Sequence, residues 1–283
     1  MTIVIGLICN NAIVLASDSQ TSDVATGQFR RNVDKIHKLR FKDGKDALVA
    51  ESGNPVFTAN VIETLTELAA NESLEHNRSL AWLAEEALAR LRKRLSVQNP
   101  DPTSLKAHFD SNSAELMLAD YANGRPNLFT LDFGLGVANR TTPGGQYSVI
   151  GCGAALAKFI LDKFHVADMQ LGEAIATAIF TVEEVKKSDL RCQGPTKAAF
   201  SVPDQSSDDP TRRTLTVLMS AEEVQKRVEE MNKFDADFKA LWKRTLTDMV
   251  YRVAEEYPVF SEGLGAVAGF GSASYGTTIE EKN

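Results

Sequence analysis

The sequence predicts an α+β protein, built as a four-layer α-β-β-α sandwich with an appended C-terminal helix. Two observations support this: blocks of adjacent strands alternate with pairs of amphipathic helices, and one long, charged helical pattern follows the last strand. Strands joined by short turns pair antiparallel, so we expect each helix pair to cover the outer face of one sheet. We divide the chain into a sandwich domain, residues 1–220, and a C-terminal helix with a Gly/Ser-rich tail, residues 221–283.

The first half of the chain opens with two strand pairs and continues with two helices. Asn10-Asn11 separates the first two apolar runs, and asparagine tolerates the positive φ of a tight hairpin turn. A polar stretch, residues 19–32, is expected to be a loop. Leu, Ile and Ala then recur at three- and four-residue spacing, which predicts amphipathic helices. We expect strands at 3–9, 12–16, 35–41 and 47–53, and helices at 56–71 and 79–97.

The second half repeats this order and ends in a longer helix. Pro100 and Pro102 end the preceding helix, and Gly and Asn turns separate the strands that follow. The last helix begins at a Ser-Ala-Glu-Glu cap pattern after residue 219. We expect strands at 115–121, 127–133, 147–153, 197–202 and 214–219, and helices at 154–164, 171–187 and 221–257.

Composition excludes several functional classes. The 283 residues carry a net charge of −7, whereas a binder of nucleic acid needs a clustered cationic face. Three cysteines and four histidines are too few and too scattered for a structural zinc site or a disulfide framework. No apolar run is long enough to cross a membrane, and the N-terminus lacks the pattern of a signal peptide. We therefore expect a cytoplasmic protein without cofactor, metal, nucleic-acid partner or membrane association.

The second residue is the first candidate for chemistry. Methionine aminopeptidase accepts small second residues, so removal of Met1 would leave Thr2 with a free hydroxyl and a free α-amine. An α-amine has an ordinary pKa of about 7.7 to 8.0, which suits it to accept the hydroxyl proton near neutral pH. Many cytosolic proteins begin with Met-Thr, so the residue pair alone does not predict a nucleophile. The prediction depends on the sequence that follows Thr2.

The surroundings of Thr2 resemble the proteasome β-subunit family of N-terminal-nucleophile hydrolases. In that family a mature N-terminal Thr begins a strand, a tight turn follows, and an Asp lies sixteen residues after the Thr. Here the run from Thr2 to Asp18 fits without a gap, and Gly6 falls on the family's glycine. The resemblance covers residues 2–219 and implies that Thr2 is the nucleophile.

The family also places a lysine in the third strand, beside the threonine hydroxyl. The segment RNVDKIHKL matches this strand and puts the lysine at Lys35, with Lys38 as the weaker alternative. The resemblance implies that Asp18 holds the charge of this lysine and orients it.

Two further segments match the parts of the family's site that bind substrate. The run LVAESGN resembles the end of the fourth strand: Gly53 matches a family glycine, and Ala50 stands where a backbone N–H donates into the oxyanion hole. The resemblance also implies substrate contacts from Thr21 and Ser22.

Two loops match the segments that surround the terminal amine in the family. SVIGCGAAL and SDLRCQGP carry Cys152, Asp189 and Cys192 at the positions of a serine, an aspartate and a second serine. A thiol is a poorer hydrogen-bond partner than a hydroxyl, so the two exchanges affect how the amine is held. If these loops flank the amine, the two thiols lie close together and near a cationic lysine, which favours oxidation. The cysteines and the long C-terminal helix indicate similarity to bacterial ancestral β-subunit (Anbu) proteins.

The resemblance implies a threonine-type peptidase or amide hydrolase that assembles into a homo-oligomeric ring or spiral. Its substrates would be peptides or unfolded proteins, and the sequence leaves open whether an ATP-dependent unfoldase supplies them. One alternative is a noncatalytic assembly subunit, which retained Met1 would produce because it acylates the amine. Another is an N-terminal-nucleophile amidase that acts on a small metabolite and needs no enclosed chamber.

Overall fold

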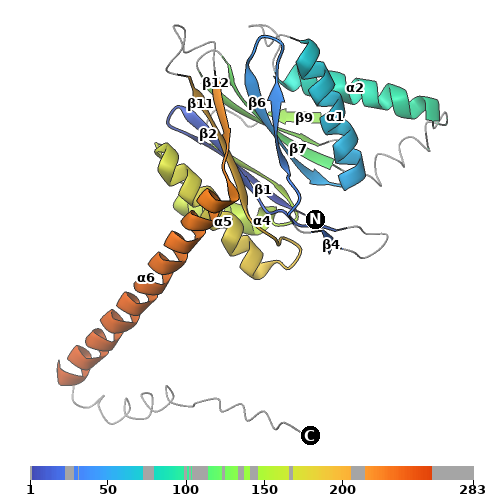
Figure 1. The fold of residues 1–283 in the computed structure, drawn as a ribbon. Coiled ribbons are helices and arrows are strands. Elements are labelled where there is room, and N and C mark those ends of the chain that lie inside the picture. The colour runs from blue at the N-terminus through green and yellow to red at the C-terminus, as the bar shows by residue number, and fades with distance from the viewer. Residues whose placement is uncertain are drawn as a thin grey trace, which may run out of the picture. The chain divides into compact units, whose positions relative to one another are not determined.

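Two five-stranded antiparallel sheets form the centre of the protein (Figure 1). The structure is a computed structural model, and it describes residues 2–22, 29–30, 32–72, 80–98, 101, 103, 114–122, 125–132, 137–140, 146–165, 168–204 and 214–256. The first sheet has the order β10-β1-β2-β11-β12, formed by β1 (Ile3–Cys9), β2 (Ala12–Ser17), β10 (Tyr147–Gly151), β11 (Lys197–Pro203) and β12 (Thr214–Leu218). The second has the order β5-β6-β7-β8-β9, formed by β5 (Ile36–Arg40), β6 (Asp46–Gly53), β7 (Ala114–Ala122), β8 (Arg125–Asp132) and β9 (Val137–Arg140).

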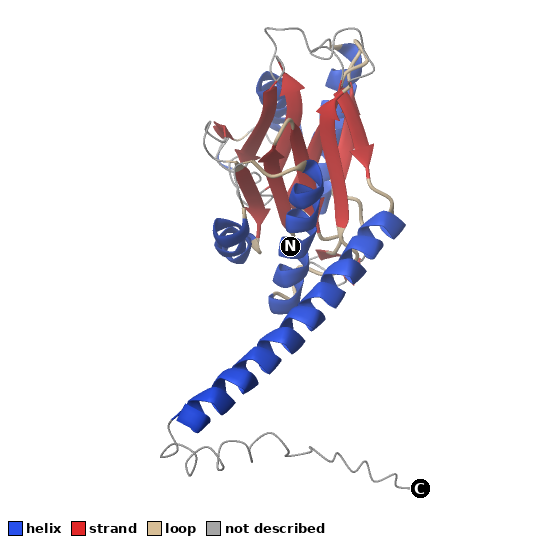
Figure 2. Ribbon diagram, turned by 90° about the vertical axis from the view of Figure 1, so that its left-hand side faces the viewer, coloured by secondary structure: helices blue, strands red, loops and turns tan. Residues whose placement is uncertain are grey.

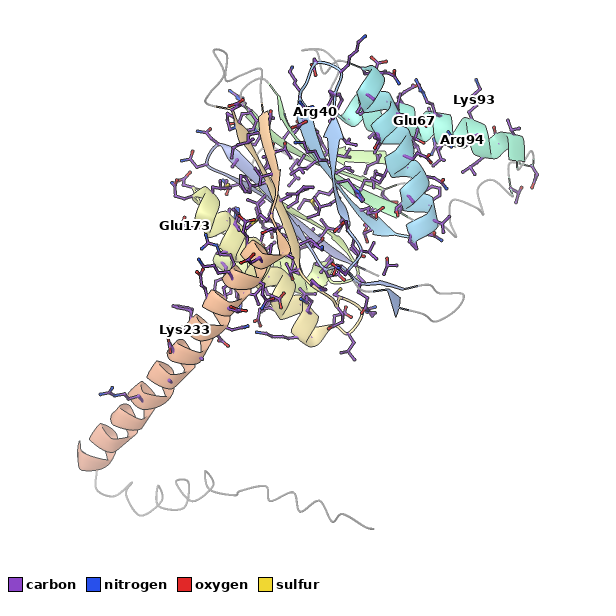
Figure 3. The ribbon with its side chains drawn as sticks, in the orientation of Figure 1. Arg40, Glu67, Lys93, Arg94, Glu173 and Lys233 are labelled. Atoms are coloured by element: carbon purple, nitrogen blue, oxygen red, sulfur yellow. The ribbon has the colours of Figure 1, made fainter. Side chains whose placement is uncertain are left out.

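One helix pair covers the outer face of each sheet, and Figure 2 shows the strands in red with the helices in blue around them. The helices are α1 (Pro55–Asn71), α2 (Leu80–Gln98), α4 (Ala154–Phe164), α5 (Leu171–Ser188) and α6 (Ala221–Glu256). The pair α1 and α2 packs on the second sheet, and α4 and α5 pack on the first. Charged side chains lie on the solvent side of these layers, as Glu67, Lys93, Arg94 and Glu173 do in Figure 3. The predicted four-layer α+β sandwich is confirmed.

The apolar core follows from the layers, and two of its clusters lie against the second sheet. One lies between the second sheet and its helices, and the other lies between the two sheets. Gly6 of β1 shows how closely the sheets approach: a Cβ added there would lie 2.5 Å from Met117 Sδ. This gives a packing reason for the glycine that the sequence resemblance singled out.

The opening hairpin forms as predicted. Cys9 pairs with Ala12, and Asn11 adopts a φ of +54°, the left-handed conformation that the tight turn requires. The polar stretch expected to be a loop instead contains two short strands, β3 (Thr21–Ser22) and β4 (Phe29–Arg30), which pair with each other. Runs of two residues carry too little periodicity to be recognised in a sequence.

The chain divides into two units, Met1–Glu229 and Glu230–Asn283. The first contains the sandwich and the first residues of α6, where Val224 is buried. The division expected after residue 220 stays a prediction about separately folding parts. Among the described residues, no helix combines the length and the apolar character needed to span a bilayer.

Candidate active site

The register of the opening hairpin brings Thr2 and Asp18 together. Val4 pairs with Ser17, and the Asp18 N–H donates to the carbonyl oxygen of Ile3 (3.3 Å). Thr2 immediately precedes β1, and Asp18 immediately follows β2. Both are buried, with 3% of Thr2 and none of Asp18 exposed. The sixteen-residue spacing is therefore the length of a hairpin that places a hydroxyl beside a carboxylate.

The Asp18 carboxylate accepts four hydrogen bonds. Its Oδ1 accepts from the backbone N–H of Ile3 (3.0 Å) and from Lys35 Nζ (2.9 Å). Its Oδ2 accepts from the N–H groups of Gln20 and Gln193, both at 3.2 Å. A buried carboxylate is costly unless it is paired and hydrogen-bonded, and these four donors meet that requirement.

The Lys35 ammonium lies between Asp18 and Thr2. Its Nζ donates to Thr2 Oγ1 (2.5 Å), to Asp18 Oδ1 and to the carbonyl oxygen of Gln20 (2.5 Å). An ammonium has three donors, so each has an acceptor. Burial lowers the pKa of Lys35 from its ordinary value, and the Asp18 charge and hydrogen bond oppose that shift.

Lys38, the weaker alternative, lies elsewhere. Its Nζ forms an ion pair with Asp46 Oδ2 at 2.7 Å, and about a third of its side chain is exposed (32%). Lys35 immediately precedes β5 and Lys38 lies within it, three residues further on, so their side chains lie on opposite sides of the extended chain. Lys35, which contacts the Thr2 hydroxyl, is therefore the lysine of this site.

A cleft of about 430 Å³ opens beside Thr2. Acidic side chains predominate among its charged groups, although His37 Nε2 lies 3.5 Å from Glu51 Oε1. The second oxygen of Glu51, Oε2, is buried and has no hydrogen-bond partner among the described residues. The lining residues are Thr2, Thr21, Val33, Asp34, Lys35, His37, Glu51, Ser52, Gly53, Pro55, Thr58, Ala59, Ile62 and Glu63.

The four residues expected to bind substrate differ in their position. Thr21 and Gly53 line the cleft, whereas Ala50 is fully buried in the core between the sheets. The Glu51 N–H donates to Lys35 O (3.0 Å), so the alternation of a strand directs the Ala50 N–H away from this side. The same alternation directs the Gly53 N–H toward it. Ser22 belongs to β3, and its side chain lies outside the described residues.

The two cysteine loops meet on another side of Thr2. Cys152 lies between β10 and α4, and its Sγ is 3.4 Å from the carbonyl oxygen of Thr2. Cys192 follows α5 and lies 3.5 Å from Cys152, sulfur to sulfur. Gly151, with φ +96°, has no room for a side chain, because a Cβ there would lie 2.1 Å from Thr2 O.

Asp189 lies beside the two thiols but is engaged by a neighbour. Arg191 donates to both carboxylate oxygens, Nε to Oδ1 (2.8 Å) and Nη2 to Oδ2 (2.7 Å). This pairing lowers the pKa of Asp189. Sequence reasoning missed Arg191, although its place two residues after a candidate aspartate is a usable signal.

Comparisons with known proteins agree with this arrangement. The family model described as "Proteasome subunit" matches residues 2–195. Among solved structures, an Anbu (Gly-1) mutant from Hyphomicrobium sp. strain MC1 has a TM-score of 0.62 at 18% identity, covering 87% of this chain and all of that one. Anbu (ancestral beta-subunit) from Yersinia bercovieri has a TM-score of 0.62 at 17% identity, covering 84% and 96%.

A third similar structure is described as the helical assembly of the Anbu complex from Pseudomonas aeruginosa. Its TM-score is 0.57 at 19% identity, and the match covers 88% of this chain and 96% of that one. At these identities the three structures establish the shared fold. Among curated protein sequences, none matches the chain. The family model spans well over half of the sequence, and the chain therefore belongs to the proteasome subunit family.

Proposed function

We propose that this protein is an N-terminal threonine hydrolase that cleaves peptide or other amide bonds. The observation that carries the proposal is the contact between Lys35 Nζ and Thr2 Oγ1, in the wall of a cleft large enough for a substrate side chain. A buried ammonium held on a hydroxyl favours the alkoxide character that a nucleophile needs. Family membership supports the same class of reaction.

The proposed reaction begins after removal of Met1, which lies outside the described residues. The α-amine of Thr2 then accepts the proton of Oγ1, and Oγ1 attacks the amide carbonyl of the substrate. The protonated amine gives its proton to the leaving amine, and an ester to Thr2 remains. Water, activated by the same amine, hydrolyses that ester. Lys35 stays an ammonium throughout and stabilises the negative charge that develops on Oγ1.

A backbone donor is also required for the oxyanion of the tetrahedral intermediate. We assign this role to the Gly53 N–H, because Gly53 lines the cleft at the end of β6. Ala50, expected at this position from the resemblance, is enclosed in the core and is not part of the proposal.

The charge of the cleft supports a preference for cationic substrates. Glu51 and Glu63 line it, and the Glu51 Oε2 atom is buried without a hydrogen-bond partner among the described residues. Lys35 is paired directly with Asp18 and interacts more weakly with Glu51, so the cleft keeps an excess of negative charge. A Lys or Arg side chain of the substrate would supply the missing donor to Glu51.

We also propose self-assembly of this protein in the cytoplasm. The Pseudomonas aeruginosa Anbu structure is a helical assembly, and its fold is shared by this chain. The odd and low number of cysteines, three in 283 residues, favours a reducing compartment.

Hydrolysis of fluorogenic peptides by two Thr2 variants tests the activity. Thr2→Ala should abolish turnover, whereas Thr2→Ser retains a hydroxyl and an amine and should keep a measurable fraction of it. Light scattering at micromolar concentration provides the second measurement. Equal turnover of wild type and Thr2→Ala would refute the mechanism, and an active monomer would favour the small-molecule amidase.

A further inference from the structure

We propose that Cys152 and Cys192 are a peroxide-sensitive thiol pair, which forms a reversible intramolecular disulfide and thereby switches off the Thr2 site. The disulfide itself follows from the two thiols alone. Its effect on catalysis rests on the function proposed above.

The two thiols are already within reach of one another. Their sulfurs lie 3.5 Å apart, so a disulfide bond of about 2.05 Å requires a closure of about 1.5 Å. Cys152 and Cys192 belong to loops between regular elements, one before α4 and one after α5. Loops can accept a shift of this size more easily than paired strands can.

The pair is asymmetric, as an attacking and a resolving thiol must be. Cys152 is partly exposed and can meet an oxidant, whereas Cys192 is fully buried. The hydrogen bond from Cys192 lowers the pKa of Cys152 to about 6, although burial opposes this shift. The same contact and burial raise the pKa of Cys192. The partly exposed Cys152 is therefore the thiol of the pair that ionises first, and its thiolate, which gives up the hydrogen bond to the Thr2 carbonyl oxygen, is the form that peroxides oxidise.

The N-terminus of α4 further favours the thiolate of Cys152. Cys152 lies two residues before Ala154, the first residue of α4, and the N-terminus of a helix attracts negative charge. The charges of the nearby Asp189–Arg191 pair act in opposite directions, because Asp189 raises the Cys152 pKa and Arg191 lowers it. Arg191 disfavours the rival interpretation of the cluster as a metal site, because it occupies both oxygens of Asp189 and repels a cation.

The proposed chemistry needs a hydroperoxide and balances as two steps. The Cys152 thiolate attacks the peroxide oxygen, the O–O bond breaks, and Cys152 becomes a sulfenic acid while the peroxide leaves as water or an alcohol. The Cys192 sulfur then attacks the Cys152 sulfur, the S–O bond breaks, and water leaves. Two thiols lose two electrons in total, and a dithiol returns them through exchange.

The disulfide would act on Thr2 through two contacts. Cys152 Sγ lies against the carbonyl oxygen of Thr2. The residue after Cys192, Gln193, donates its N–H to Asp18 Oδ2, and Asp18 in turn holds Lys35. Closure of the thiol pair pulls on both, so the carboxylate loses one of its donors and the ammonium shifts from Thr2 Oγ1.

The third cysteine provides an internal control. Cys9 is 4% exposed, its Sγ donates to the carbonyl oxygen of Ala12 (3.6 Å), and burial raises its pKa to about 11. Such a thiol should resist peroxide under conditions that oxidise Cys152.

The test treats the full-length protein with hydrogen peroxide near pH 7, alkylates remaining thiols, and maps peptides without reduction. A peptide pair joined through Cys152 and Cys192, lighter by two hydrogen atoms and separated by dithiothreitol, is the expected product. In Cys192→Ser, a sulfenic acid on Cys152 should be trapped by dimedone instead. Cys9→Ala should leave the cross-link unchanged.

Three outcomes would overturn the proposal: no Cys152–Cys192 cross-link, oxidation of Cys9 as fast as that of Cys152, or a cross-link that joins two chains. Peptide hydrolysis is measured on the same samples. A cross-link that leaves hydrolysis intact would refute the switch. A cross-link in a protein that never hydrolyses peptides would keep the thiol pair and remove the proposed function.

Discussion

Thr2 lies between two polar clusters that are built differently. The ion-pair cluster, Asp18 with Lys35, is buried, and each of its donors and acceptors has a partner. In the thiol cluster, Cys152 is partly exposed and Cys192 is buried, and a single sulfur contact joins them. The comparison shows that the fold holds the charged groups on one side of Thr2 in a fixed geometry. On the other side it places two thiols whose oxidation state can change.

Among the variants that test this comparison, removal of Lys35 should have the largest effect on turnover and stability. Lys35→Ala is expected to lower turnover by several orders of magnitude, because removing one residue of a catalytic unit costs nearly as much rate as removing the whole unit. It should also destabilise the protein by roughly 3–5 kcal/mol, since Asp18 is left buried without its counterion. Steady-state hydrolysis and denaturant unfolding measure the two effects.

Lys38→Ala is the matched control for this change. It removes a lysine three residues further along the chain whose partner is Asp46 and not Asp18 or Thr2, so turnover should stay near that of the wild type. Near-normal turnover of Lys35→Ala, with loss in Lys38→Ala, would reverse the assignment.

The pH dependence tests the charge of the ion-pair cluster. As the pH rises through the lowered pKa of Lys35, below its ordinary value of 10.5, the ammonium is lost and turnover should fall. Asp18→Asn removes the charge that opposes the shift, so this alkaline limb should move to lower pH. Turnover that instead rises with deprotonation would make Lys35 a base.

Turnover should fall as the pH rises, but the contribution of Lys35 to the free energy of unfolding should increase. Between the native pKa of Lys35 and 10.5, the unfolded chain binds more protons than the folded one. The contribution of Lys35 to the free energy of unfolding therefore rises with pH over this window. A difference between wild type and Lys35→Met in unfolding curves across that range isolates it.

Glu51 should have a moderate effect that is confined to substrate choice. Glu51→Gln is expected to lower kcat/KM about tenfold for peptides with Lys or Arg beside the cleaved bond, and little for those with Leu. Paired peptides that differ in this residue alone make the measurement. Equal losses for both peptides would point to a structural role.

Exchange of the two thiols should have the smallest effect. In reducing buffer, Cys152→Ser with Cys192→Ser should raise turnover about two- to fivefold, because hydroxyls are stronger hydrogen-bond partners than thiols. A loss of turnover by orders of magnitude would show that the thiol cluster is as indispensable as the ion-pair cluster.

Local patterns were sufficient for one part of the site. The Asn10-Asn11 turn sets the hairpin register, and that register alone brings Asp18 beside Thr2. Lys35 and the cysteine loops come from distant segments, so only the family resemblance could indicate their proximity. Periodicity says nothing about contacts between segments.

Other parts of the site left no usable pattern in the sequence. The Gln20 carbonyl and the Gln193 N–H hold the ion-pair cluster, and any residue could supply such backbone groups. The role of Ala50 stays a prediction, because the motif fixes only a neighbourhood, whereas the alternation of a strand decides which N–H faces the cleft.

The central claim is that Thr2 acts as an N-terminal nucleophile, and intact-mass measurement of active protein tests it most directly. The sample is treated with a peptide epoxyketone, which bonds to both the hydroxyl and the amine of an N-terminal threonine. We predict a mass without Met1, a shift by one inhibitor molecule, loss of hydrolysis, and an adduct located at Thr2. Full activity in protein that retains Met1, or an adduct at another residue, would contradict the account.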